Sequence, residues 1–322
     1  GSNDIGARQR GRVFSFALRA RDALRSADGL LAMSFTADTA ALSSPGLNLR
    51  GINALKIEGA NTDVTFATSG GTQLAIGSGN ILSVGVNQTI GNATLMAAAS
   101  SPVVFFGAIT GTGAVATAPV FTSVEGGFLV AAGANLTVNA AFFTTANVTK
   151  GLGGNLTFAT KQFFNSGASY FTINGGTVTL AGGENTLWQG AQGGTSGQHL
   201  AIGPGATLNL GANAQMVGQI KSPNGTALAA TGGVITGTGT LINADTQGTT
   251  GVWGGSIQGT GLYYNKAGST GATFYSDNTY TGGTLFTGGT LTLIDEGKLS
   301  GTSSVELAYG GLTLNNGGTA NV

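Results

Sequence analysis

One histidine, His199, is the single imidazole in a chain of 322 residues, and it follows a serine closely in the stretch Ser196-Gly197-Gln198-His199. A serine within reach of a histidine can act as a nucleophile, because the imidazole takes the proton of the hydroxyl. However, no acidic residue stands directly before Ser196, and no Gly-x-Ser-x-Gly turn surrounds it. We therefore expect His199 to be a loop residue, not a catalytic base.

Carboxylates are the other groups that could carry chemistry, as the acid and base of glycoside cleavage or as calcium ligands. They are scattered thinly from residue 47 onward, and the chain has no cysteine. We expect solvated turn carboxylates, no catalytic centre, no metal and no cofactor. The pairs with a chance of meeting are Glu58 with Asp63, Glu184 with Asp245, and the neighbours Asp295 and Glu296.

Aromatic doublets are a more informative feature, because neighbours in a strand point to opposite faces. A doublet in a strand would place one ring in the core and the other on the surface, where it could dock another chain. The alternative is that both rings are buried at a corner or under a loop. Phe142 and Phe163 are about one turn of chain apart, so we expect the outer rings there to stack. The candidate interaction surface comprises Phe105, Phe106, Phe142, Phe143, Phe163, Phe164, Tyr263 and Tyr264.

The elements that would position these rings are short strands separated by glycine turns. Leu291-Thr292-Leu293 alternates between two faces, and the pattern returns at Leu312, 21 residues later. Similar triplets at Leu136, Leu156 and Val178 have steps of 20 and 22 residues. A period near twenty built from short strands is typical of a solenoid. We predict an all-β fold over 47–322, a right-handed single-stranded parallel β-helix of roughly 11–14 turns.

Residues 277–318 resemble the autotransporter-associated β-strand repeat. The resemblance is carried by Asn-Thr-Tyr-Thr-Gly-Gly-Thr, then Gly-Gly-Thr-Leu-Thr-Leu, then Gly-Leu-Thr-Leu-Asn-Asn-Gly, with weaker echoes over 130–245. It implies a secreted β-helix on a bacterial surface, attached to the outer membrane through a part outside this chain. The same scaffold carries adhesins, toxins and inert stalks, so it specifies no activity.

The amino-terminal segment 1–46 differs from everything after it. Six of the thirteen basic residues lie between Arg8 and Arg25, and apolar positions recur there at helical spacing. We predict an amphipathic helix over 7–27. It would cap the open end of the β-helix, or alternatively bind a membrane surface or a partner.

Composition excludes further classes. The net charge is zero and charged residues are 8%, which gives no electrostatic case for nucleic acid. No run is long enough for a membrane span.

The chain ends within a repeat, from which we expect a truncated carboxyl end. We expect an extracellular stalk or adhesin that binds proteins or itself through its ends and surface. The alternatives are a filament or sheath subunit, and a polysaccharide lyase or tailspike-type hydrolase.

Overall fold

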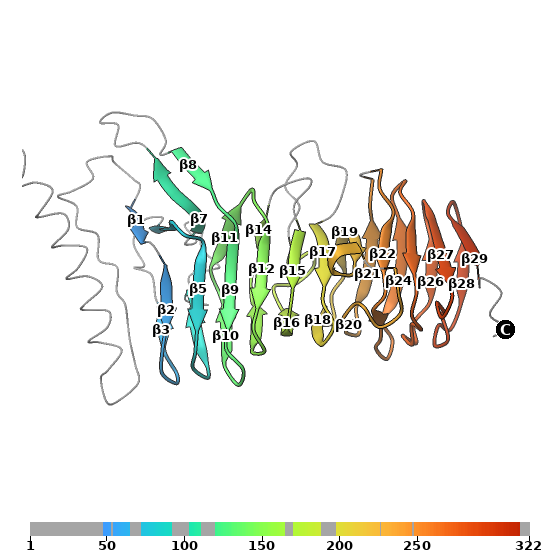
Figure 1. The fold of residues 1–322 in the computed structure, drawn as a ribbon, viewed down its shortest axis with the longest axis horizontal. Helices are drawn as coiled ribbons and strands as arrows, with labels where there is room; N and C mark the ends of the chain where they lie inside the picture. The colour runs from blue at the N-terminus through green and yellow to red at the C-terminus, as the bar shows by residue number, and fades with distance from the viewer. Residues whose placement is uncertain are drawn as a thin grey trace, which may run out of the picture.

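The structure, a computed structural model, describes residues 48–52, 54–64, 72–91, 103–110, 120–164, 170–187, 198–225, 227–246 and 248–315. Over these residues the chain forms an all-β parallel β-solenoid of about nine turns. Figure 1 shows the turns stacked along the long axis, from β1 at one end to β29 at the other. The parallel β-helix predicted from residue 47 is thus confirmed as a β-solenoid. The predicted helix 7–27 and the segment 1–46 lie outside the described residues.

Four sheets run along the described solenoid, and their strands pair in parallel except at β8. Sheet I contains β1 (Asn48–Ile52), β4 (Thr72–Ile76), β7 (Val103–Thr110), β11 (Ala141–Thr144) and β14 (Phe163–Phe164), with β8 (Val120–Ser123) paired to β7. Sheet II contains β2 (Leu55–Ile57), β5 (Asn80–Ser83), β9 (Gly126–Val130), β12 (Val148–Gly151), β15 (Tyr170–Ile173), β17 (Gln198–Ile202), β19 (Gln215–Lys221), β21 (Thr240–Ala244), β24 (Tyr263–Ala267), β26 (Thr284–Phe286) and β28 (Val305–Leu307).

The other two sheets complete the turns. Sheet III contains β3 (Asp63–Val64), β6 (Gln88–Ile90), β10 (Asn135–Val138), β13 (Asn155–Phe158), β16 (Gly176–Leu180), β18 (Ala206–Asn209), β20 (Val234–Thr236) and β23 (Ser256–Ile257). Sheet IV contains β22 (Gly251–Trp253), β25 (Ala272–Phe274), β27 (Thr290–Ile294) and β29 (Gly311–Asn315). A single short 3₁₀ turn, η2 (Pro223–Gly225), is the helix that the described residues contain. No helix among them is long and apolar enough to cross a bilayer.

The register between turns follows the leucine spacing of the sequence. Leu136 lies opposite Leu156, and Leu156 lies opposite Val178. Leu291 likewise lies opposite Leu312. The predicted steps of 20, 22 and 21 residues are therefore single turns of the solenoid.

Insertions lengthen other turns. Ile81 in β5 lies opposite Phe128 in β9, a step from 81 to 128 that contains the antiparallel β7–β8 hairpin. Val178 lies opposite Leu208, a step of 30 residues, and residues 188–197 between them lie outside the described residues. Because such turns use more chain, the solenoid has about nine turns and not the roughly 11–14 of a uniform repeat.

The apolar sides of most strands whose side chains are described face a continuous core along the axis. In the middle turns this core contains stacked phenylalanine rings, with neighbouring centroids 5.0 to 5.9 Å apart in edge-to-face or tilted contacts. The stack gives a three-residue strand the burial that it cannot obtain alone. Its members are Phe106, Phe128, Phe142, Phe158, Phe164 and Phe171.

Buried amide side chains tie neighbouring turns together inside this core. The Oε1 atom of Gln162 accepts the backbone N–H of Phe142 at 3.1 Å, and its Nε2 donates to the carbonyl of Ala140 at 3.2 Å. Gln215 and Asn278 also accept a backbone N–H of the preceding turn and donate to carbonyls. Each side-chain amide thus provides the hydrogen-bond partner that a backbone N–H or C=O group of the neighbouring turn needs when it is buried.

Candidate interaction surface

All four aromatic doublets lie in strands, namely in β7, β11, β14 and β24. In each doublet one ring is buried and its neighbour is half-buried on the outer side. The expected division into one inner and one outer ring is confirmed, and the alternative of two buried rings is wrong. The inner rings are Phe106, Phe142, Phe164 and Tyr264, and the outer rings are Phe105, Phe143, Phe163 and Tyr263.

Three outer rings form a column on sheet I, which we name the outer phenylalanine column: Phe105, Phe143 and Phe163. Phe143 lies opposite Phe105 in β7 and opposite Phe163 in β14. The centroids of Phe105 and Phe143 are 5.7 Å apart at an interplanar angle of 61°. The predicted stacking of Phe142 with Phe163 is wrong, because the register turns Phe142 into the core.

Tyr263 does not belong to this column, because it lies on sheet II in β24. Its ring packs closely over Gly283, where an added Cβ would lie 2.5 Å from the ring. The inner partner Tyr264 is fully buried, and its hydroxyl donates to Oδ1 of Asn243 at 3.2 Å. Burial raises the pKa of Tyr264 well above its usual value. This doublet therefore has a packing role within the solenoid.

The three strands that carry the outer phenylalanine column contain no charged residue, although the exposed Lys161 lies two residues before Phe163. Val103 and Ala141 share its face one step along their strands, and they lie opposite each other. No residue of β7, β11 or β14 is charged. A partner at this face would meet mainly apolar surface, which is the chemistry of an interface core.

His199 lies in β17 and is buried, so the expectation of a loop histidine is wrong. Its Nδ1 atom accepts the backbone N–H of Gln219 at 2.7 Å, at the register shift between β17 and β19. The imidazole also lies 5.2 Å from the Tyr170 ring, between centroids. Burial and the charge of Asp245 raise the pKa of Tyr170. His199 thus stabilises the pairing of β17 with β19 at the register shift. Ser196 lies outside the described residues.

The carboxylates of the described residues do not gather into one site. Glu58 pairs with a neighbouring lysine, and Asp63 accepts a hydrogen bond from a threonine hydroxyl of the next turn. Glu184 is exposed whereas Asp245 is buried, and the pair at 295–296 is exposed in a turn. Over the part of the chain that the structure describes, no three His, Cys, Asp or Glu side chains are grouped to hold a metal ion.

Two lysines, Lys150 and Lys266, lie inside the solenoid, which the sequence pattern did not indicate. Both side chains are fully buried. The ammonium of Lys150 donates to three backbone carbonyls at 2.8 to 3.0 Å, and that of Lys266 donates to one carbonyl at 2.5 Å. Burial lowers the pKa of each lysine to about 8. The two ammonium groups provide hydrogen bonds to backbone carbonyls, but removing their charge from water costs free energy.

Because of these two lysines, we expect the free energy of unfolding to rise with pH between about 8 and about 10. In this window the unfolded chain, whose lysines have the ordinary pKa of 10.5, holds protons that the folded chain has released. One pKa unit corresponds to about 1.4 kcal/mol of unfolding free energy. Because hydrogen bonds from the ammonium to backbone carbonyls offset part of this effect, we expect the free energy of unfolding to rise by about 1–2 kcal/mol per lysine.

Urea unfolding across this pH window tests the prediction. Lys266→Met and Lys150→Met should each flatten the rise, whereas the exposed Lys298→Met should leave it unchanged. Above pH 10 the sign reverses, because burial raises the pKa of Tyr280 to about 12 and the unfolded chain then loses its tyrosine protons first. A wild-type free energy of unfolding that stays constant from about pH 8 to 10 would contradict the assignment.

Comparison of the chain with protein-family models, with curated proteins and with solved structures finds no significant match.

Proposed function

We propose that the protein is a secreted β-helix of a bacterial cell surface, serving as a structural stalk or an adhesin. In this proposal the solenoid is right-handed, the segment 1–46 caps its amino-terminal end, and the function involves no catalysis. Three features support it: the parallel β-solenoid, the lack of cysteine, and the resemblance of 277–318 to the autotransporter-associated β-strand repeat. A continuous core lets such a rod reach length without disulfides.

The observation that carries the contact role is the outer phenylalanine column. A solenoid that only spans distance needs no column of three half-buried rings at matching register positions on strands without a charged residue. Such rings contribute when another protein surface covers them. We propose that this face of sheet I contacts other protein chains, including neighbouring copies of the same rod.

The proposal predicts association that depends on the outer phenylalanine column. Light scattering after size exclusion should show concentration-dependent assembly of the 322-residue chain. The triple variant Phe105→Ser/Phe143→Ser/Phe163→Ser should weaken it at least about tenfold, because each ring contributes on the order of 1 kcal/mol at an interface. Far-UV circular dichroism of the variant should remain that of the wild type.

The matched control lies on sheet III, where three half-buried threonines form a column of their own: Thr137, Thr157 and Thr179. Replacing these three by serine should leave assembly unchanged. A wild-type chain that stays monomeric at tens of micromolar, or a triple phenylalanine variant that assembles as well as the wild type, would remove the contact role.

A further inference from the structure

The pairing of β17 with β19 contains a β-bulge, and side chains bond to the backbone of its extra segment. Between two successive pairs of the register, β19 advances by three residues while β17 advances by two. Nδ1 of His199 accepts the backbone N–H of Gln219 at 2.7 Å. The side-chain amide of Asn243 in β21 donates to the carbonyl of Gly218. At this point β17 and β19 are therefore joined in part through a side chain, the imidazole of His199.

Gln219 connects this bulge to two other turns of the solenoid. Its Oε1 atom accepts the hydroxyl of Tyr170 in β15, and its Nε2 atom donates to the carbonyl and the hydroxyl of Thr249 at 2.8 and 3.0 Å. The ring of Tyr170 also packs against the imidazole, with centroids 5.2 Å apart. Breaking the bond between His199 and Gln219 therefore loosens contacts that reach from β15 to the segment before β22.

This bond requires a neutral imidazole. A neutral ring accepts a hydrogen bond only at the nitrogen that carries no hydrogen, so the ring hydrogen of His199 is on Nε2. A protonated ring carries hydrogens on both nitrogens, and Nδ1 would then oppose the N–H of Gln219 with a second donor. The imidazole is also 3% exposed, and burial disfavours its charged form. Protonation and the closed bulge therefore exclude each other.

The charged and titratable groups near the imidazole, among the described residues, are Tyr170 in β15, Lys221 in β19 and Asp245 directly after β21. Burial and the charge of Asp245 raise the pKa of Tyr170, so its phenol is uncharged at neutral and acidic pH. The ammonium of Lys221 lies 3.6 Å from the centroid of the Tyr170 ring and disfavours a second positive charge nearby. The buried carboxylate of Asp245 acts in the opposite direction. Because these two charges oppose each other, the bond to Gln219 and burial decide in favour of the neutral imidazole.

We propose that His199 is an acid-sensitive latch: the neutral imidazole holds the bulge closed, and its protonation opens the pairing of β17 with β19 while the rest of the solenoid stays folded. In the open form the imidazole takes up a proton at about pH 6.5, as an ordinary histidine does. The closed form excludes this proton, so the latch is fully effective above about pH 6.5 and weakens as the pH falls below it. Between about pH 7.5 and about pH 5.5 the ratio of open to closed form should rise about tenfold.

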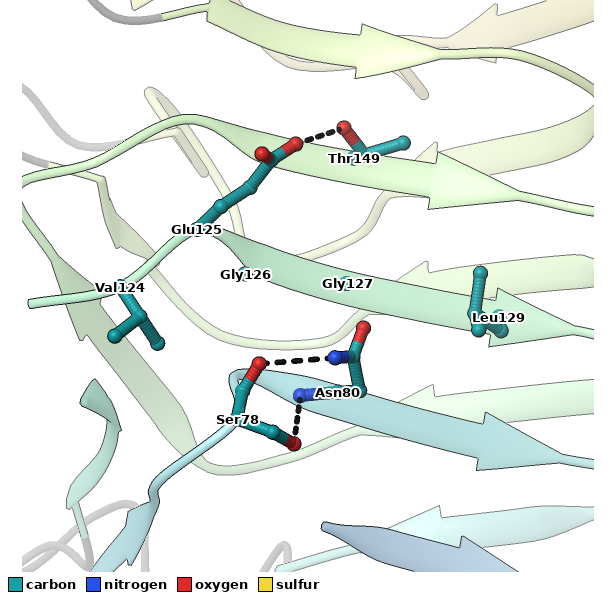
Figure 2. A pocket seen from close by; sticks show the side chains of 8 residues that line it. All are labelled: Ser78, Asn80, Val124, Glu125, Gly126, Gly127, Leu129 and Thr149. Carbon is teal, nitrogen blue, oxygen red and sulfur yellow. Dashed lines mark hydrogen bonds between the residues drawn. The ribbon is translucent and has the colours of Figure 1, made fainter. Parts of the chain in front are cut away.

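Hydrogen exchange read by mass spectrometry tests the latch on the 322-residue chain, at about pH 7.5 and about pH 5.5, with labelling times scaled for the pH dependence of intrinsic exchange. Peptides that cover β17 and β19 should lose protection about tenfold at the lower pH. The matched control region is β9 with β12 on the same sheet, where the register has no shift and Glu125 accepts from the hydroxyl of Thr149 at 2.9 Å (Figure 2). Its protection should not change, because no histidine lies there.

Two variants separate the latch from a merely structural role. His199→Asn retains an oxygen that can accept the N–H of Gln219 but takes up no proton in this range, so it should keep β17 and β19 protected at both pH values. His199→Leu has no acceptor, so these strands should be weakly protected at both. Thermal melting checks that the variants are folded, and if His199→Leu does not fold, His199→Asn alone decides.

Three outcomes would each overturn the proposal. The first is equal protection of β17 and β19 in the wild type at both pH values. The second is an acid response that persists in His199→Asn, because a carboxylate and not the imidazole would then be responsible. The third is a loss of protection along the whole solenoid at once, which would mean that acid unfolds the rod without a local latch. The result is independent of the assembly test, because the latch shares no residue with the outer phenylalanine column.

Discussion

Replacing Phe142 by alanine is expected to lower the free energy of unfolding by about 3–5 kcal/mol. Phe142 is fully buried, and its ring lies 5.0 Å from that of Phe106 and 5.2 Å from that of Phe128, between centroids. Truncation removes apolar burial and leaves a cavity in a core that neighbouring turns hold in place. The loss should propagate, because each turn of a solenoid is stabilised by its neighbours.

The adjacent residue provides the matched control. Phe143 is the same residue type one position along β11, but it faces outward. Phe143→Ala is therefore expected to cost under about 1.5 kcal/mol in a dilute, unassembled chain. Urea unfolding followed by circular dichroism measures both. Equal losses for the two variants would contradict the assignment of inner and outer faces, and so would a larger loss for Phe143→Ala.

This pair also shows how far the sequence predicts the structure. The period of the leucines predicts which turns are neighbours, because Leu136, Leu156 and Val178 stand alone between polar residues. A doublet such as Phe142-Phe143 does not identify its inner member, since a shift of one residue exchanges the two faces. The spacing therefore predicts an aromatic column but chooses the wrong partner for Phe163.

Other features depend on contacts between distant turns. His199 stands next to a polar, glycine-containing stretch that is typical of a loop, yet pairing with Tyr170 in β15 makes it part of a strand. No local pattern places β5 against β9 across 47 residues, from Ile81 to Phe128, because the β7–β8 insertion lies between them. Tertiary pairing overrides local preference at both places.

Buried polar residues are the least predictable part of this core. In sequence, nothing marks Gln162 or Lys150 as buried, because long polar side chains are usually exposed. Only the structure shows that their polar atoms meet backbone groups of an adjacent turn. Chains of this kind need such residues where the backbone of one turn lacks a partner in the next.

Replacing Gln162 by leucine is expected to lower the free energy of unfolding by about 2–4 kcal/mol, although leucine is the more apolar residue. The side chain amide of Gln162 accepts from the N–H of Phe142 and donates to the carbonyls of Ala140 and Thr160 at 3.2 and 2.9 Å. Leucine fills a similar volume but leaves these groups without partners, and each buried unsatisfied group costs about 1–3 kcal/mol. The gain in apolar burial offsets only part of that cost.

The matched control for this variant is Gln258→Leu, since Gln258 is exposed and its amide bonds only to the hydroxyl of Ser256. It should change the free energy of unfolding by less than about 0.5 kcal/mol. Native-state hydrogen exchange gives the local readout, because the amide of Phe142 should lose protection in Gln162→Leu and keep it in the control. If leucine at 162 is neutral or stabilising and that amide stays protected, the buried amide does not tie the turns together and apolar packing alone holds this part of the solenoid.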